Sequence, residues 1–438
     1  MRSFGRAFVA LHHRNYKLFW WGQLISLVGT WMQSTAQAWL VLQLTGSAAD
    51  LGIVTALQSL PVLGGGLFGG MVADWMPKRR LIVITQTVQL LLALALGILV
   101  STHLVQMWHI YLLATLLGVS NAFDMPARQA FVVEMVGRDD LMNAVALNSM
   151  QFNAARVVGP AIAGVSIALI GVTGSFYANA ASFVAVIVGL LMMRPSELFE
   201  VEQAPRDSVI GSLVEGCRYV LRAPVILLIT LLVCVLGLFA FNVPVLVPII
   251  ARDDLHSGAI GYGGLMAAQG IGALLAALTA AYMQRVSWKL IIGGALLLSG
   301  FEVLFGLSHI YVLSFILLLI AGYGMVMFFT SANTGVQIEA PNALRGRVMG
   351  VYMSVNMGSG PIGNLAAGFM AGLYGAAFTM AATAAAAFAL ILGVAGFLYS
   401  RRASPAYRIA MPGAGDAFAP TALPAPERDT VLRKAAAG

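Results

Sequence analysis

A series of twelve long apolar segments constrains this chain more than any other feature. Each has about 20 residues or more, which is the length that a helix needs to cross a bilayer about 30 Å thick. The segments cover residues 18–44, 48–73, 81–101, 108–127, 143–170, 174–193, 225–250, 258–283, 290–307, 311–337, 348–373 and 376–400. They are rich in Ala, Leu and Gly, whereas barrel strands would alternate over about 10 residues. We therefore expect an all-α membrane protein with twelve transmembrane helices.

The composition agrees with this interpretation. Hydrophobic residues make up 59% of the chain and charged residues 10%, against about 45–50% and about 25% in soluble domains. So few charges cannot cover a water-facing surface, which excludes a soluble multidomain enzyme and a disordered chain. Two cysteines, Cys217 and Cys234, are too few for a disulfide framework.

The spans divide into two sets of six. We expect an N-terminal half over residues 18–193, a cytoplasmic central loop over 194–224 and a C-terminal half over 225–400. Residues 1–17 alternate basic and apolar side chains, which is typical of an amphipathic segment on the inner leaflet; the alternative is an ordered start to the first span. The tail, 401–438, is rich in Pro, Ala and Gly and is expected to be disordered and cytoplasmic.

The basic residues predict the orientation. With both termini placed inside, all 25 Lys and Arg except Arg156 and Arg252 fall in segments on the cytoplasmic side, as the positive-inside rule requires. The net charge of +7 therefore reflects topology and contact with membrane lipids. We expect no nucleic-acid partner.

The two halves repeat one motif. Gly159–Pro160 in the fifth span has a counterpart, Gly360–Pro361, in the eleventh, and each follows a cytoplasmic loop with two arginines. Two parallel six-span repeats are the architecture of many secondary transporters, whose site lies at the midplane between the repeats. We expect alternating access by rocking of the halves.

Several stretches together resemble one family. Residues 70–80 read GMVADWMPKRR, residues 121–129 read NAFDMPARQ, residues 143–164 carry Asn153, Arg156 and Gly159–Pro160, and residues 215–219 read EGCRY. These stretches resemble the Major Facilitator Superfamily, and within it the drug:proton antiporter-like branch that includes the enterobactin exporters. Pro77 departs from the usual loop pattern, which has Gly there.

The resemblance implies a function. We expect proton-coupled efflux of a small amphipathic molecule, a drug or a siderophore, by a monomer in the bacterial inner membrane. An importer or uniporter with the same fold is the alternative. A membrane-embedded enzyme would need a catalytic cluster, and the sequence has none. It also lacks a GxxxxGK[ST] phosphate loop, an HExxH motif and a Cys/His cluster, so we expect no ATP hydrolysis, no cofactor and no metal.

The loop after the second span predicts a conformational latch. Asp74 lies at the negative end of its own helix, which is unfavourable by up to about 1 kcal/mol, so it needs a positive partner. The resemblance implies that the partner is the N-terminus of the eleventh span. The alternative is a plain turn and topology signal. The expected latch residues are Gly70, Asp74, Lys78, Arg79, Arg80 and Arg128.

Gly and Pro in the spans predict kinks and close helix packing. A proline removes one helix hydrogen bond and bends the helix, and small residues four apart let two backbones approach. We expect the fifth and eighth spans to pack tightly, although small residues are common in all membrane helices. The residues are Gly159, Pro160, Gly164, Gly264, Gly272, Gly360 and Pro361.

Polar side chains inside the spans are candidates for a substrate cavity. Those of the first span fall within an arc of about 80° on one helix face, and they either line a cavity or join helices by hydrogen bonds. The full set is Gln23, Ser26, Thr30, Gln33, Gln37, Asn153, Arg156, Asn242, Gln269, Asn333, Gln337 and Asn356.

Three charged residues lie at membrane depth. Arg156 is the clearest, and a charge there costs about 2.5–3.5 kcal/mol on insertion scales. Asp124 is the expected partner of Arg156, either as a proton carrier or as half of a fixed ion pair. Glu302 is isolated and is the second proton-coupling candidate, with a structural hydrogen bond as its alternative.

Overall fold

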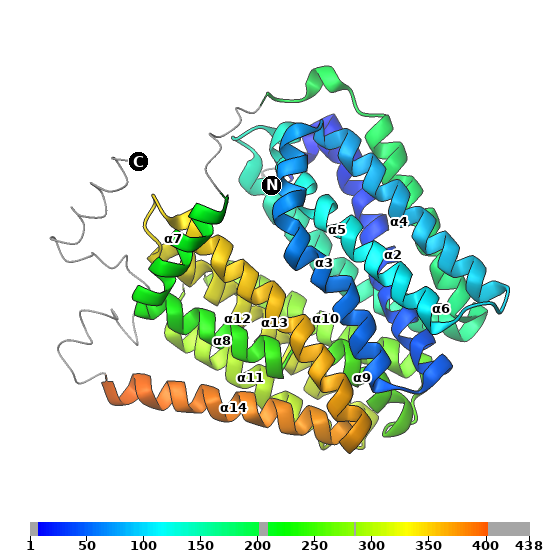
Figure 1. Ribbon diagram of the computed structural model, residues 1–438, viewed down its shortest axis with the longest axis vertical. Helices are drawn as coiled ribbons and strands as arrows, with labels where there is room; N and C mark the ends of the chain where they lie inside the picture. Colours follow the sequence, from blue (N-terminus) through cyan, green and yellow to red (C-terminus); the bar gives the residue numbers. More distant parts are fainter. Residues whose placement is uncertain (1–7, 201–208, 284–285, 402–438) are drawn as a thin grey trace.

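The computed structural model describes residues 8–200, 209–283 and 286–401, and these ranges contain helices and no strand (Figure 1). The first group of helices comprises α2 (Arg14–Thr45), α3 (Ala48–Trp75), α4 (Lys78–Ser101), α5 (Met107–Val136) and α6 (Leu141–Leu191). The second comprises α8 (Pro224–Phe239), α9 (Val243–Asp253), α10 (Gly258–Met283), α11 (Trp288–Gly306), α12 (Tyr311–Glu339), α13 (Arg345–Tyr374) and α14 (Ala376–Arg401). A shorter helix, α7 (Val209–Arg222), precedes α8, and two 3-10 helices cover Val9–His12 and Pro195–Glu197.

The described helices are consistent with twelve passages through a membrane. Nine described segments are long and apolar enough to cross one, and α8 with α9 forms one of them. The 51-residue α6 reverses at Gly171, whose φ of +73° suits glycine, and therefore supplies two passages. Helices α2 and α13 have similar lengths and more polar side chains, and they complete the set.

Several element bounds differ from those expected from hydrophobicity. Helix α2 begins at Arg14, inside the segment expected to lie on the membrane surface, and α5 continues to Val136. The passage expected over 225–250 breaks between α8 and α9, where Pro244 occupies the first turn of α9 and has no N–H to donate. The expected central loop contains α7. Residues 1–7 and 402–438, in the expected N-terminal segment and tail, lie outside the described residues.

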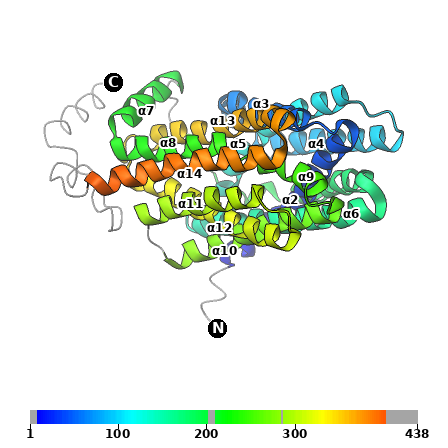
Figure 2. The same cartoon turned by 90° about the horizontal axis from the view of Figure 1, so that it is seen from below.

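The two groups of helices share a core at one end of the molecule. One buried cluster joins residues of α2 and α3, such as Trp39 and Leu51, to residues of α9 and α13, such as Leu246 and Ala367. The other two large clusters belong to one group each. In Figure 1 the groups converge on α9, and Figures 1 and 2 place α14 at the outer edge of the second group.

Two seams of closely packed helices connect the groups, α3 with α13 and α6 with α10. A Cβ atom added to Gly52 would lie 2.8 Å from the carbonyl oxygen of Asn364, and one added to Gly263 would lie 2.6 Å from that of Pro160. Because these contacts are between backbones, both positions require glycine.

Glycines bring α3 and α13 into close contact at one end of their seam, and the described glycines at the other end make no such contact. Gly52 packs on α13 near the loop that joins α2 to α3, whereas Cβ atoms added to Gly70, Gly346 and Gly350 would have no described atom within 4 Å. We call the end of the seam at Gly52 the closed end. We call the other end, which carries the loop Met76–Pro77, the open end.

Candidate functional site

The polar row of α2 is mostly buried against its own group. Gln33 accepts a 2.7 Å hydrogen bond from Asn179 of α6 and Gln37 accepts one of 3.4 Å from Gln58 of α3. Ser26 is also buried, Gln23 has a buried oxygen without a described partner, and Thr30 is exposed. Gln33 and Gln37 therefore join helices by hydrogen bonds, which is one of the two roles considered for this row, the other being to line a cavity.

The remaining polar candidates are spread over several helices. Asn333 and Gln337 of α12 are hydrogen-bonded to each other, and Asn153 of α6 donates to the carbonyl of Ser149. Asn242 and Gln269 are buried, and Asn356 is partly exposed. The structure therefore does not bring all of these residues together into one surface.

Asp124 lies in a buried network between α4 and α5. Its carboxylate pairs with Arg128, one turn later in α5, and accepts hydrogen bonds from Thr85 at 2.6 Å and Gln86 at 3.3 Å. The expected pair between Asp124 and Arg156 does not form, because the nearer guanidinium of Arg128 occupies the carboxylate.

Sequence reasoning missed the α4 half of this network. Gln89 of α4 donates to Ser120 at 3.3 Å and to Asn121 at 3.1 Å, both in α5. Gln89 lies four residues after Thr85 and three after Gln86 in a largely apolar helix, and that spacing places all three on one face. This spacing is the sequence feature from which the three side chains of α4 could have been predicted.

Arg156 lies between the two groups of helices. Its guanidinium carbon is 5.7 Å from the ring centre of Trp31 in α2, and one of its nitrogens is 3.5 Å from the sulfur of Met325 in α12. Arg156 is partly exposed. Gly159 allows the approach of α2, because a Cβ there would lie 2.5 Å from the Cβ of Trp31.

Glu302 is fully buried in α11. Both of its carboxyl oxygens lack a hydrogen-bond partner among the described residues. Helix α11 packs against α12 and α14, away from the seams that join the two groups. The structure therefore does not show the hydrogen bond that we considered as its structural role.

The expected latch residues make contacts within the first group. Lys78 pairs with Glu134 of α5 at 2.7 Å, and Arg79 donates to the carbonyl oxygens of Leu190 and Leu191 at 2.7 and 3.0 Å. The side chain of Asp74 lies outside the described residues, Arg80 is exposed and Arg128 is held by Asp124. The charge–dipole contact itself stays a prediction.

The expected close packing of the fifth and eighth spans is present, with a different set of glycines on α10. Gly263 and Gly270 face α6, where Gly263 packs on Pro160 and Gly164, and Gly270 packs on the backbone of Arg156. Gly264 and Gly272 instead face Tyr311 and Leu319 of α12.

The second copy of the repeated Gly–Pro motif lies in α13. Its Pro361 is buried, and a Cβ atom added to its Gly360 would have no described atom within 4 Å.

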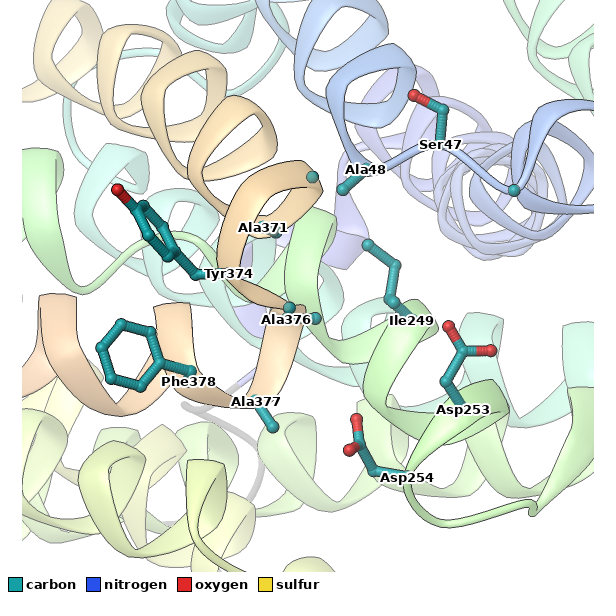
Figure 3. Close-up of a pocket in the computed structure, with 13 residues that line it drawn as sticks. Ser47, Ala48, Ile249, Asp253, Asp254, Ala371, Tyr374, Ala376, Ala377 and Phe378 are labelled. Carbon is teal, nitrogen blue, oxygen red and sulfur yellow. The ribbon is translucent and has the colours of Figure 1, made fainter.

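A pocket of about 630 Å³ lies at the closed end, between the α2–α3 loop, α9 and the α13–α14 loop (Figure 3). Ser47, Asp253, Asp254 and Tyr374 are among its lining residues. Burial raises the pKa of Asp254, and the charge of Asp253 raises it further, whereas His309 and His256 act in the opposite direction. Its lining residues are not among those expected from the sequence.

Comparisons with known proteins agree on a transporter. The sequence profile of the transmembrane secretion effector family matches residues 6–410. The multidrug efflux pump Tap of Mycolicibacterium fortuitum is 31% identical over 78% of this chain and 86% of its own. The staphyloferrin A transporter of Staphylococcus aureus is 26% identical over 82% and 90%. The enterobactin exporter EntS of Shigella boydii is 26% identical over 87% and 90%.

Solved structures with the same fold are also transporters. The nucleoside transporter NupG superposes with a TM-score of 0.70 at 13% identity, over 87% of this chain and 98% of its own. An inward-facing bacterial homologue of the lysosomal transporter Spinster gives 0.70 at 15% identity, over 90% and 99%. The chain belongs to the transmembrane secretion effector family of the Major Facilitator Superfamily.

Proposed function

We propose that this protein is a secondary transporter that expels a small amphipathic molecule, a drug or a siderophore, in exchange for protons. The observation that carries the proposal is the asymmetric closure between the two groups of helices. They share a core and close glycine contacts at one end, and the α3–α13 seam is open at the other. Its relatives include proteins named as a multidrug efflux pump and a siderophore exporter.

The orientation follows from the basic residues. We place the open end, with its basic α3–α4 loop, on the cytoplasmic side of the bacterial inner membrane, together with both termini. The midplane between the groups then faces the cytoplasm, which is the state that takes up a substrate for export. Rocking about the two seams would carry the substrate to the other side, and no ATP is needed.

Two carboxyl groups are available to carry the proton. Asp124 is held in an ion pair with Arg128 and in hydrogen bonds with Thr85 and Gln86, so its protonation would have to break that pair. Glu302 is buried without a described partner, so its charged form has nothing to stabilise it there. Glu302 is therefore the better proton site, and Asp124 the better structural anchor.

The latch is the second part of the proposal. Asp74, at the end of α3, would contact the positive N-terminus of α13 when the open end closes, and would release it when that end opens. Lys78 and Arg79 are held by Glu134 and by the end of α6, so they fix the start of α4 and the short loop that follows Asp74. We expect Asp74→Asn to abolish transport without lowering the amount of protein in the membrane.

Transport by everted membrane vesicles tests the proposed function. A dye or drug should accumulate in vesicles that contain the wild-type protein, and accumulation should stop when an ionophore collapses the pH gradient. Vesicles with Asp74→Asn protein are the matched control. Accumulation that is insensitive to the pH gradient would remove proton coupling, and accumulation only in right-side-out vesicles would favour the alternative, an importer. We expect a monomer in lipid to carry out the transport.

A further inference from the structure

We propose that Arg156 and the side chains around it bind the aromatic carboxylate of an anionic substrate at the middle of the membrane. This inference rests on the proposed function, for which it names the substrate class. The site consists of Trp31 in α2, Phe152 and Arg156 in α6, and Met325 in α12, and we call it the Arg156 site.

The Arg156 site lies at mid-membrane and joins the two groups. Trp31 is near the middle of α2 (Arg14–Thr45), Met325 is at the middle of α12 (Tyr311–Glu339), and Arg156 is at the middle of the part of α6 that precedes Gly171. Two of these helices belong to the first group and one to the second. A ligand held here would therefore contact both groups, as a substrate of a rocking transporter must.

The charge of Arg156 is not balanced by any described carboxylate. The nearest candidates by sequence have other partners, since Asp124 pairs with Arg128 and Glu134 pairs with Lys78. The two described contacts of the guanidinium are a thioether, which is a weak acceptor, and the face of an indole ring. Charged groups in such surroundings are normally paired, so the guanidinium offers donors that an anion can accept.

A carboxylate matches the donors of this site. A guanidinium presents a planar fork of N–H groups that bind both oxygens of a carboxylate at once. The bound oxygens would displace the sulfur of Met325 from its 3.5 Å contact. Arg156 keeps part of its surface exposed, so the residue is not sealed inside the core.

The aromatic rings define the rest of the ligand. The ring centres of Trp31 and Phe152 are 5.7 Å apart with an angle of 73° between their planes, and Phe152 is 47% exposed. Rings in this arrangement offer an apolar surface beside the guanidinium, where a planar aromatic body can pack. Gly159 fixes the arrangement, because only glycine leaves room for Trp31 at this distance.

The alternative is a purely structural contact in which Arg156 ties α6 to α2 and α12. Binding of a charged and an uncharged ligand of the same shape distinguishes the two. The probes are naphthoate and naphthamide, measured by calorimetry on the purified full-length protein in detergent at neutral pH. Three proteins are compared, the wild type, Arg156→Lys and Arg156→Met.

We expect naphthoate to bind the wild type more tightly than naphthamide. Arg156→Met should weaken naphthoate by about tenfold or more, the range for a hydrogen-bonded charge, and leave naphthamide unchanged. Arg156→Lys, which keeps the charge and serves as the folding control, should retain part of the affinity. Equal binding of the two probes, or naphthoate binding that Arg156→Met does not change, would overturn the inference.

The proposed function can fail separately. Naphthoate binding that depends on Arg156, without any transport by vesicles, would remove the transport proposal and keep the anion site. Drug accumulation in everted vesicles, with no naphthoate binding, would remove the anion site and keep the transport proposal.

Discussion

The guanidinium of Arg252 in α9 donates a 3.1 Å hydrogen bond to the main-chain carbonyl of Leu42 in α2. The two residues belong to different groups of helices. Leu42 is in the last turn of α2, where the carbonyl oxygens carry the negative end of the helix dipole. Asp253 holds the same guanidinium with bonds of 2.5 and 2.9 Å. Arg252 therefore ties the two groups together at the closed end.

The first prediction is that Arg252→Gln loosens the closed end. A hydrogen bond from a charged group contributes about 1.5–3 kcal/mol, so its loss should shift the equilibrium between open and closed forms by roughly tenfold. Electron–electron distance measurements between spin labels at Thr45 and at the exposed Leu307, with Cys217 and Cys234 replaced by serine, report this separation.

Asp253→Asn is the matched control for that experiment. It weakens the support of Arg252 and keeps the bond to Leu42, so its effect on the distance distribution should be smaller. Identical distributions for wild type and Arg252→Gln would show that the closed end does not depend on this tie.

The second prediction is that the population of the closed form depends on pH. Burial and the charge of Asp253 raise the pKa of Asp254 in this conformation, so the ionised form of Asp254 is disfavoured while the end is closed. The closed end should be most populated at low pH. It should lose population as the pH rises from the ordinary value of about 3.9 through the raised pKa.

The label distance, followed against pH, checks this sign. Asp254→Asn should remove the pH dependence in that range. His256 and His309 lower the pKa of Asp254, so their replacement by glutamine should move the transition to higher pH. A closed population that increases with pH in the wild type would contradict the argument.

The third prediction separates an anchor from a proton carrier at Asp124. The side chains of Arg128 and Asp124 are 15% and 6% exposed, so Asp124→Asn leaves a buried unpaired guanidinium. Removing one partner of a buried pair costs about 3–5 kcal/mol, and the thermal unfolding midpoint of the purified protein should fall. Replacing both residues, Asp124→Asn with Arg128→Met, should recover most of the loss.

Transport gives the second readout for this pair. If Asp124 is only an anchor, the double variant should still transport and respond to a pH gradient. Normal stability with uncoupled transport in Asp124→Asn would instead make Asp124 the proton carrier.

Hydrophobicity alone predicted the helical membrane fold, because a bilayer admits few alternatives to apolar helices. The choice of partners could not be predicted in the same way. The spacing of Asp124 and Arg128 is visible in the sequence, and so is Arg156, but which guanidinium reaches the carboxylate depends on how α5 and α6 sit against each other. Asp124 and Arg128 lie one turn apart in the same helix, so their ion pair forms locally and takes the place of the expected pair with Arg156.

The glycines of α10 show the limit of pattern reasoning in another form. Gly263 and Gly270 are seven residues apart, close to two full turns, and they share the face that packs on α6. Gly264 and Gly272 form an equally regular set on the face toward α12. Small residues occur on both faces, so their spacing predicts close packing without predicting the neighbour.

The last prediction compares the two copies of the repeated Gly–Pro motif. A Cβ added at Gly159 would lie 2.5 Å from the Cβ of Trp31 and 2.9 Å from the carbonyl oxygen of Val28, whereas one added at Gly360 would meet no described atom within 4 Å. Gly159→Ala must therefore push α2 away from α6. Such overpacking costs about 1–3 kcal/mol, so the unfolding midpoint should fall. Gly360→Ala, with the same change of one methyl group in a helix, should leave the midpoint unchanged or slightly raised, since alanine favours helices. Equal midpoints for the two variants would mean that the contact between Trp31 and Gly159 does not limit stability, and the geometry of the Arg156 site would then need another support.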